Sequence, residues 1–237
     1  MRNTYTINNF DNHLIIEDNG KTFLIDTGSP FSIFDGASFD FCGRQFPKGM
    51  TMVSIEAVSD LLGMNIDALV GNDILKYYNV LFDYAGGTIT FSDENLSLPG
   101  RQAIALGNAF GIPKVTMQLR GQEGTFFLDT GAKISYVKAS TLDGLTPDSQ
   151  ATDFYVGYGD FDTPIYHVPT SIGGHEFIVQ YGTLPRILEL SLIGLSGTTG
   201  VVGYDFFNNF MVLLDHRNDT LWLRPAAGSL PTDAVIE

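Results

Sequence analysis

Apolar residues occur along the chain in short runs separated by turn-forming residues, a pattern that predicts β-strands. Residues 14–28, LIIEDNGKTFLIDTG, show it clearly, with Asn19-Gly20 between two apolar runs. Asn and Gly both accept a positive φ, so this dipeptide predicts a two-residue turn between paired strands. The segment is therefore expected to form a β-hairpin that ends in Asp-Thr-Gly.

The same pattern recurs later in the chain. Residues 117–131, MQLRGQEGTFFLDTG, match residues 14–28 without a gap, and a second pair of matching segments lies at 68–92 and 200–224. Near its start, each segment of the second pair has two apolar residues and a glycine, and it continues with a short helical turn, an apolar strand, a turn and a closing strand. A repeat of this length predicts two equivalent lobes.

The segment between the two copies has no apolar periodicity and contains a Pro-Gly pair, which interrupts regular structure. We therefore expect a first lobe at residues 1–98, a linker at 99–104 and a second lobe at 105–237. The interval between Asp-Thr-Gly and the later glycine is 29 residues longer in the second lobe. That surplus is enough for one long hairpin.

The composition agrees with a packed β protein. Hydrophobic residues make up 44% of the chain and charged residues only 17%, which favours a substantial core over disorder. The 18 Phe and 10 Tyr, together with 26 Gly and 10 Pro, favour short strands joined by tight turns. The predicted fold class is all-β.

The charge excludes polyanionic partners. The chain has 13 Lys and Arg against 27 Asp and Glu, a formal net charge of −14. Nucleic-acid binding needs clustered basic residues, and an acidic membrane surface repels a protein of this charge. We expect neither nucleic acid nor membrane as a partner.

Cysteine and histidine usage argues against a disulfide or a metal centre. Cys42 is the only cysteine, so neither an intrachain disulfide nor a thiolate zinc cluster can form, and the four histidines lack His-x-x-x-His spacing. No cofactor is expected.

The first residues lack the basic and apolar runs of a secretory signal, and no run approaches the ~20 apolar residues that cross a bilayer. This favours a soluble cytoplasmic protein, unless a leader has been removed.

The duplicated Asp-Thr-Gly suggests a specific chemistry. Asp26 and Asp129 each follow a strongly apolar run, so each carboxylate is expected at the end of a buried strand. Two carboxylates held within ~3 Å of each other cannot both ionise, and they share one proton. Such a pair contains an acid and a base, which can activate a water molecule and hydrolyse a peptide bond without a metal.

These motifs resemble the aspartic proteases of the pepsin and retropepsin kind. The resemblance is carried by DTGSPFSIF and DTGAKISYV, each followed by two apolar residues and a glycine, Gly71 or Gly203. It covers nearly the whole chain. It implies a bilobal all-β fold with a cleft between the lobes and an endopeptidase activity on extended peptides.

The resemblance also implies roles for individual residues. Asp26 and Asp129 match the catalytic pair. The threonines next to them correspond to residues whose hydroxyls lock the two loops together, and the glycines that follow correspond to residues whose N–H groups point at the carboxylates. These supporting residues are Thr27, Gly28, Thr130 and Gly131.

The residue after each motif differs between the lobes. Ser29 matches the pepsin serine that hydrogen-bonds the outer oxygen of its aspartate, whereas Ala132 matches the retropepsin form, which has no hydroxyl. A hydrogen bond to the charged form lowers a pKa. This asymmetry predicts that Asp26 is the ionised member of the pair.

The resemblance is incomplete at the substrate-covering flap. Pepsins carry the flap in the first lobe, where this chain is too short. Residues 153–168 alternate apolar side chains around a Gly-Tyr-Gly-Asp tip and are our candidate flap, with Gly157, Tyr158 and Gly159 near the substrate and Tyr158 capping the cleft. The alternative is an ordinary surface hairpin beside a cleft that is open on one side.

Lys133 is a second departure from the family pattern. If its ammonium lies near the cleft, it favours acidic groups on the substrate. The alternative is that the side chain points into solvent, as lysines after turns usually do.

Together these observations predict an aspartic endopeptidase that acts on a peptide or protein substrate. It is expected to be a monomer, because the repeat supplies both aspartates. Two alternatives remain, a catalytically silent peptide-binding module on the same fold, and a glycosidase, which would need its carboxylates ~5 Å or more apart.

Overall fold

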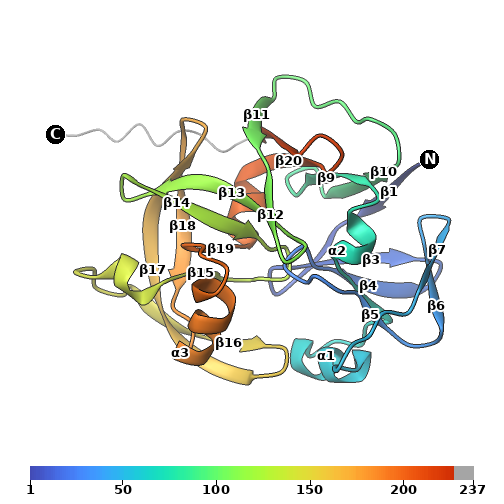
Figure 1. Ribbon diagram of the computed structural model, residues 1–237, viewed down its shortest axis with the longest axis horizontal. Coiled ribbons are helices and arrows are strands. Elements are labelled where there is room, and N and C mark those ends of the chain that lie inside the picture. Colours follow the sequence, from blue (N-terminus) through green and yellow to red (C-terminus); the bar gives the residue numbers. More distant parts are fainter. Residues whose placement is uncertain (227–237) are drawn as a thin grey trace.

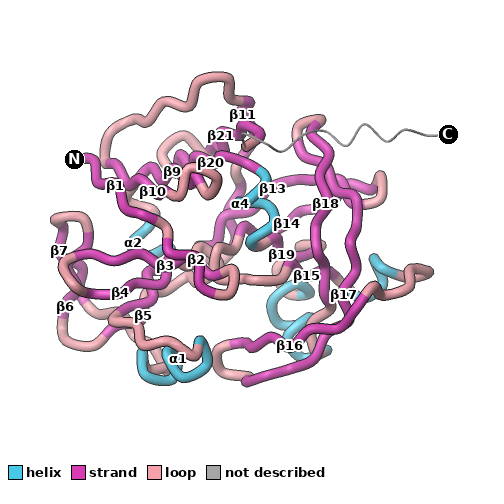
Figure 2. Tube along the Cα trace, turned by 180° about the vertical axis from the view of Figure 1, so that it is seen from behind, coloured by secondary structure: helices cyan, strands magenta, loops and turns pink. Residues whose placement is uncertain are grey.

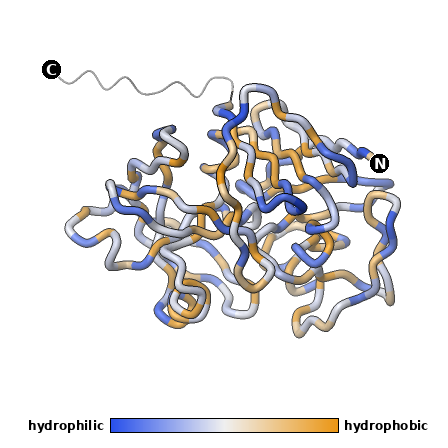
Figure 3. The backbone as a smooth tube through the Cα atoms, turned by 45° about the horizontal axis from the view of Figure 1, so that its top comes forward, coloured by the Kyte–Doolittle hydropathy of each residue, from blue (hydrophilic) through white to orange (hydrophobic). Residues whose placement is uncertain are grey.

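The computed structural model describes residues 1–226 and consists mostly of strands arranged in two lobes (Figure 1). The prediction of an all-β, two-lobed fold is confirmed. Apolar stretches lie mainly in the interior strands, and polar stretches follow the turns and outer loops (Figure 3). Residues 227–237 of the expected second lobe lie outside the described part of the chain.

The first lobe contains a five-stranded sheet, a separate hairpin and two short helices. The sheet order is β2 (Asn8–Phe10), β3 (His13–Asp18), β4 (Lys21–Ile25), β8 (Ala68–Val70), β5 (Ile33–Phe34). The hairpin and helices are β6 (Ser38–Phe41), β7 (Arg44–Pro47), α1 (Ile55–Leu62) and α2 (Asn72–Leu75).

The second lobe is built on an eight-stranded sheet. Its order is β12 (Gly107–Ala109), β13 (Ile112–Leu119), β14 (Gln122–Leu128), β19 (Gly200–Val202), β15 (Ser135–Val137), β18 (His175–Gly182), β17 (Gly159–Ile172), β16 (Ser149–Tyr155). Its helical segments are a 3-10 turn (Ala139–Leu142), α3 (Arg186–Leu188) continuing into a π-helical turn (Glu189–Gly194), and α4 (Tyr204–Asn209).

The two predicted hairpins, β3–β4 and β13–β14, turn in the same way. In the first, Asn19 and Gly20 have φ of 52° and 74°, and in the second, Arg120 and Gly121 have φ of 53° and 75°. Positive φ at both central residues gives a turn whose twist matches that of paired strands. The two turns bring the following strands to equivalent places in their lobes.

The strands that lead to the two Asp-Thr-Gly segments lie inside their sheets. β4 runs parallel to β8, and β14 runs parallel to β19, so each motif emerges beside the strand that ends in two apolar residues and glycine. A third strand, β5 or β15, pairs antiparallel on the other side of that neighbour. This arrangement explains why the two motifs occur together in each half of the sequence.

A third sheet joins the lobes. Its order is β1 (Arg2–Thr6), β10 (Thr88–Ser92), β9 (Asn79–Asp83), β20 (Phe210–Asp215), β21 (Thr220–Pro225), β11 (Gln102–Ala105). The halves meet at the β9–β20 pairing. Three residues of the expected linker, 102–104, belong to strand β11, whereas the lobe boundary itself remains a prediction.

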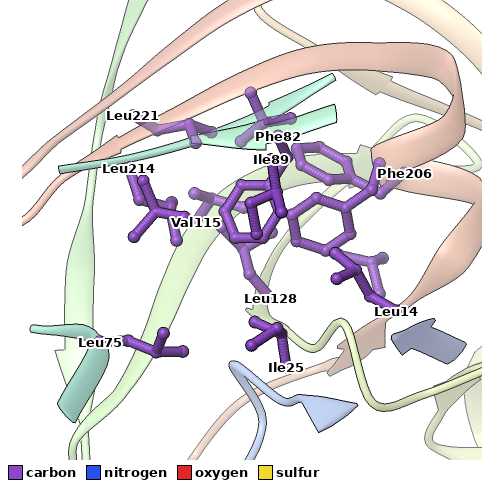
Figure 4. Packing of buried hydrophobic residues seen from close by; sticks show 14 of the residues in the cluster. Leu14, Ile25, Leu75, Phe82, Ile89, Val115, Leu128, Phe206, Leu214 and Leu221 are labelled. Carbon is purple, nitrogen blue, oxygen red and sulfur yellow. The ribbon is translucent and has the colours of Figure 1, made fainter. Parts of the chain in front are cut away.

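The main core runs without a break through both halves of the chain. In Figure 4, Phe82 and Ile89 from the first half lie beside Phe206, Leu214 and Leu221 from the second. All five are fully buried. The lobes therefore share their hydrophobic stabilisation.

Helix α1 has no counterpart in the second lobe. It begins after Ser54, whose hydroxyl accepts the N–H of Ala57, and ends at Gly63, which has a left-handed φ of 71°. These are standard helix start and stop signals. Figure 2 shows α1 at the edge of the first lobe, next to β16 of the second.

No helix in residues 1–226 has the length and apolar character needed to cross a membrane.

The shared core predicts cooperative unfolding. Phe82 of β9 packs 5.0 Å, between ring centroids, from Phe207 of α4, and both rings are fully buried. Phe82→Ala should lower the free energy of unfolding by about 3–5 kcal/mol. Urea unfolding followed by circular dichroism should still give one transition for the whole molecule.

A matched control is Leu195→Ala, because Leu195 is 78% exposed. Its stability should lie within about 0.5 kcal/mol of the unsubstituted protein. Two separate transitions, only one of them shifted by Phe82→Ala, would contradict a shared core.

Candidate active site

The two Asp-Thr-Gly loops meet between the lobes. Asp26 follows β4, and its N–H donates to the carbonyl of Val70 at 3.0 Å. Asp129 follows β14, and its N–H donates to the carbonyl of Val202, also at 3.0 Å. Both carboxyl groups are partly buried and line one cleft.

Four buried hydrogen bonds tie the loops together. The hydroxyl of Thr27 donates to the Leu128 carbonyl (2.8 Å) and accepts the N–H of Thr130 (3.0 Å). The hydroxyl of Thr130 donates to the Ile25 carbonyl (2.7 Å) and accepts the N–H of Thr27 (3.0 Å). Each threonine therefore holds the strand end that precedes the opposite aspartate.

The glycines that follow the threonines make room for the opposite carboxyl group. A Cβ on Gly28 would lie 2.1 Å from the Asp129 Cγ, and one on Gly131 would lie 2.6 Å from the Asp26 Cγ. No side chain fits at either position without moving an aspartate. The two carboxyl groups also lie close enough to shift each other's pKa.

The hydrogen bonds around the carboxyl groups are not symmetric. Asp26 Oδ1 accepts the N–H groups of Gly28 and Ser29, both at 2.9 Å, whereas Asp129 Oδ1 accepts the N–H of Gly131 at 2.8 Å. The expected bond from the Ser29 hydroxyl to Asp26 is not formed. That hydroxyl donates to the Phe31 carbonyl at 2.7 Å, because the turn brings this acceptor within reach two residues later.

Both carboxyl groups are harder to ionise than ordinary aspartates. Burial raises the pKa of each. The charge of Asp26 raises the pKa of Asp129 further, whereas the hydrogen bond from Asp129 lowers that of Asp26. The two N–H groups on Asp26, against one on Asp129, favour Asp26 as the charged member, and the Ser29 hydroxyl has no part in this.

Two serines support the loops and were not identified from the sequence. Ser32 accepts the N–H of Gly71 at 2.9 Å, and Ser135 accepts that of Gly203 at 3.0 Å. Each lies six residues after its aspartate. Their identical places in the repeat were the signal that could have found them.

Asn72 is a further buried support, present in the first lobe only. Its amide donates to the carbonyls of Thr27 (2.5 Å) and Ser29 (3.0 Å). The second lobe has Tyr204 at the matching position, whose main-chain N–H donates to the Ala132 carbonyl at 3.0 Å. Because the repeat does not share Asn72, the pattern gave no signal for it.

The cleft has a volume of about 170 Å³ and is lined by both lobes and by the β16–β17 hairpin. The hairpin contributes Phe154, Tyr155, Val156 and Phe161. Phe154 and Val156 pack against a buried apolar cluster of the first lobe that includes Val58 of α1. The hairpin therefore crosses from the second lobe to the first (Figure 2).

The tyrosine of the hairpin that lines the cleft with the aspartates is Tyr155, not Tyr158. Burial raises the pKa of Tyr155 to about 12, and the charges of Asp129 and Asp26 add to this shift. Tyr158 is 47% exposed and is absent from the cleft lining. Gly157 and Gly159, with φ of 85° and 103°, form the turn that carries Tyr158 beyond the cleft.

Lys133 does not point freely into solvent, because its side chain is only 16% exposed. Its ammonium lies 2.9 Å from a carboxylate oxygen of Asp11 and 3.8 Å from one of Asp153, which lines the cleft. The expectation of a solvent-exposed lysine is therefore wrong, and a preference for acidic substrate groups stays a prediction. Within residues 1–226, no group of three or more His, Cys, Asp or Glu side chains is arranged to hold a metal ion.

Comparison with known proteins yields likenesses in structure but none in sequence. No family model matches the chain, and no curated protein matches it. A crystal structure of a retropepsin-like aspartic protease from Rickettsia conorii superposes with a TM-score of 0.39 and 18% identity, covering 52% of this chain and 89% of that one.

The threonine bonds make a direct prediction about stability. Thr27→Val should lower the free energy of unfolding by roughly 2 kcal/mol or more, because it leaves a buried carbonyl and a buried N–H without partners. Thr27→Ser keeps the hydroxyl and should lose less. Equal urea midpoints for both variants and the unsubstituted chain would contradict this role of the hydroxyl.

Proposed function

We propose that this chain is an aspartic endopeptidase and that Asp26 and Asp129 are its catalytic residues. The observation that carries the proposal is the adjacent pair of carboxyl groups, held at one cleft by two loops that are locked together. A pair in which one member is protonated and the other charged provides a general acid and a general base at one point.

The reaction follows from these two groups. The Asp26 carboxylate takes a proton from a water molecule as the water oxygen attacks the peptide carbonyl, and Asp129 gives its proton to the carbonyl oxygen. The resulting gem-diol collapses when the C–N bond breaks. The leaving nitrogen receives the proton from Asp26, and Asp129 recovers a proton from a hydroxyl of the diol.

Substrate binding is proposed to involve the β16–β17 hairpin as a flap. Its side chains Phe154, Tyr155 and Val156 form one wall of the cleft, opposite the aspartates. An extended peptide can pair with such an edge as an added strand, with its side chains in apolar pockets. Because one chain supplies both aspartates, we propose that the monomer is the active form.

The arrangement of the carboxyl groups disfavours a glycosidase. Retaining and inverting glycosidases keep their carboxyl groups ~5 Å or more apart, whereas here each carboxyl group packs against the glycine next to its partner's motif threonine and shifts the partner's pKa. A silent peptide-binding module is the remaining alternative. Its carboxyl pair would bind peptides without cleaving them.

The first test is peptide hydrolysis. Asp26→Asn and Asp129→Asn should each reduce kcat by about 10³-fold or more, because each removes an acid or base from the reaction. Mass spectrometry of a digested peptide library measures this, with pepstatin as inhibitor. The surface variant Asp60→Asn, far from the two motifs in sequence, serves as the control.

Binding of library peptides without new termini, at every pH from 3 to 8, would support the silent module instead. Hydrolysis at an unchanged rate in both Asn variants would contradict the assignment of Asp26 and Asp129 as catalytic residues.

The second test is the pH dependence. Activity requires Asp26 charged and Asp129 protonated, so it should fall when the pH drops below the pKa of Asp26 and when it rises above that of Asp129. Both pKa values are raised. The acidic and the basic limb of the pH–activity profile should therefore both lie at higher pH than they would for carboxyl groups with the ordinary pKa of ~3.9.

Ala132→Ser tests the assignment of the proton. If the new hydroxyl donates to Asp129, and not to a main-chain carbonyl as the Ser29 hydroxyl does, it stabilises the charged form, lowers its pKa and should move the basic limb down by about one pH unit. Ser29→Ala should leave the acidic limb in place, since its hydroxyl donates to Phe31. An unmoved basic limb together with a shifted acidic limb would reverse the assignment.

A further inference from the structure

Lys133 lies between two carboxylates that belong to different lobes. Its ammonium contacts Asp11, in the turn between β2 and β3 of the first lobe, and Asp153, on β16 of the second. The Lys133 side chain is only 16% exposed and that of Asp153 only 6%, whereas Asp11 is 62% exposed. The ammonium therefore bridges the β16–β17 hairpin, close to its tip, to the opposite lobe.

The Asp153 carboxylate is fixed from several sides. The Tyr136 hydroxyl donates to one of its oxygens, and the N–H of Phe154 donates to the other at 2.9 Å. Lys133 supplies the only cationic partner of Asp153 among residues 1–226. An ion pair of this kind resists separation, because removing one partner leaves a buried charge uncompensated.

The next residue along the hairpin continues the contact with the first lobe. The Phe154 ring stacks on the ring of buried His13, with centroids 5.7 Å apart and planes 21° apart. Phe154 and Val156 also pack on the apolar cluster beside α1. The hairpin is thus held against the first lobe by stacking, apolar packing and the Lys133 bridge.

This closed arrangement leaves little room for a substrate. The cleft volume of about 170 Å³ is below the ~300–1,000 Å³ of typical ligand pockets. An extended peptide therefore requires the hairpin to move away from the first lobe. That movement separates the Lys133 ammonium from either Asp11 or Asp153.

We propose that Lys133 is a positioning residue that latches the flap of the second lobe to Asp11 of the first, and thereby sets how often the cleft opens. The inference rests on the proposed function for its kinetic consequences. Lys133 also lies four residues after Asp129, so the latch connects flap position to the loop that carries a catalytic aspartate.

Opening is measured first without catalysis. In an Asp26→Asn background, hydrogen exchange followed by mass spectrometry should show faster exchange of residues 149–161 in Lys133→Met. Asp11→Asn should accelerate the same segment by about two- to fivefold, the range expected for a partly exposed ion pair. The control Lys138→Met removes a nearby positive charge that forms no ion pair among residues 1–226 and should leave the segment unchanged.

Two further variants make the measurement specific. Lys133→Arg keeps the cation and should restore slow exchange. Combining Lys133→Met with Asp11→Asn should add nothing to Lys133→Met alone, because both remove the same bridge. Asp11 has a positive φ of 48°, which Asn tolerates well, so Asp11→Asn decides the question even if Lys133→Met does not fold.

Inhibitor kinetics give the second measurement. If the latch limits opening, both the association and dissociation rate constants of pepstatin should rise in Asp11→Asn, by similar factors. A residue with a merely structural role would lower the association rate or change neither constant. Unchanged exchange of residues 149–161 in Asp11→Asn, or an effect equal to that of Lys138→Met, would overturn the latch.

The two proposals can fail separately. Faster exchange in a chain that cleaves no peptide supports the latch and counts against the protease. Normal exchange in a chain that cleaves peptides through Asp26 and Asp129 supports the protease and overturns the latch.

Discussion

The site depends on the four hydrogen bonds between Thr27 and Thr130 and the strand ends of the opposite lobe. Two carboxyl groups in contact repel each other once both are charged, so the lobes must be held together by something other than the aspartates. The threonine hydroxyls provide this, since each donates to a carbonyl and accepts an N–H across the interface. Both side chains are buried, so water cannot replace these bonds.

The rest of the fold supports this contact from behind. The sheet shared between the halves and the continuous apolar core prevent the lobes from separating. A chain with a net charge of −14 also places two acids side by side at its centre. The electrostatic cost appears as raised pKa values, and a raised pKa is the property that lets one carboxyl hold a proton while its partner is charged.

The lobes are related by a repeat, yet the cleft they form is not symmetric. The first lobe carries helix α1, and the second carries the long β16–β17 hairpin that rests on the apolar cluster beside it. Lys133 and Asp153 in the second lobe meet Asp11 in the first. The repeat thus supplies the chemical centre, and the unrepeated segments supply its cover.

The sequence alone determined the strands, the two turn-linked hairpins and the pair of Asp-Thr-Gly loops, because turn chemistry and apolar alternation act between near neighbours in the chain. It also indicated the supporting threonines and glycines, whose positions repeat. Only the tertiary structure decided that Tyr155 and not Tyr158 faces the aspartates, that the Ser29 hydroxyl turns to Phe31, and that Lys133 pairs with Asp11. The Lys133–Asp11 contact joins residues 122 positions apart, and the orientations of Tyr155 and Ser29 follow from local turns whose direction depends on the packing around them. No periodicity records such contacts, since they arise only when the lobes close on each other.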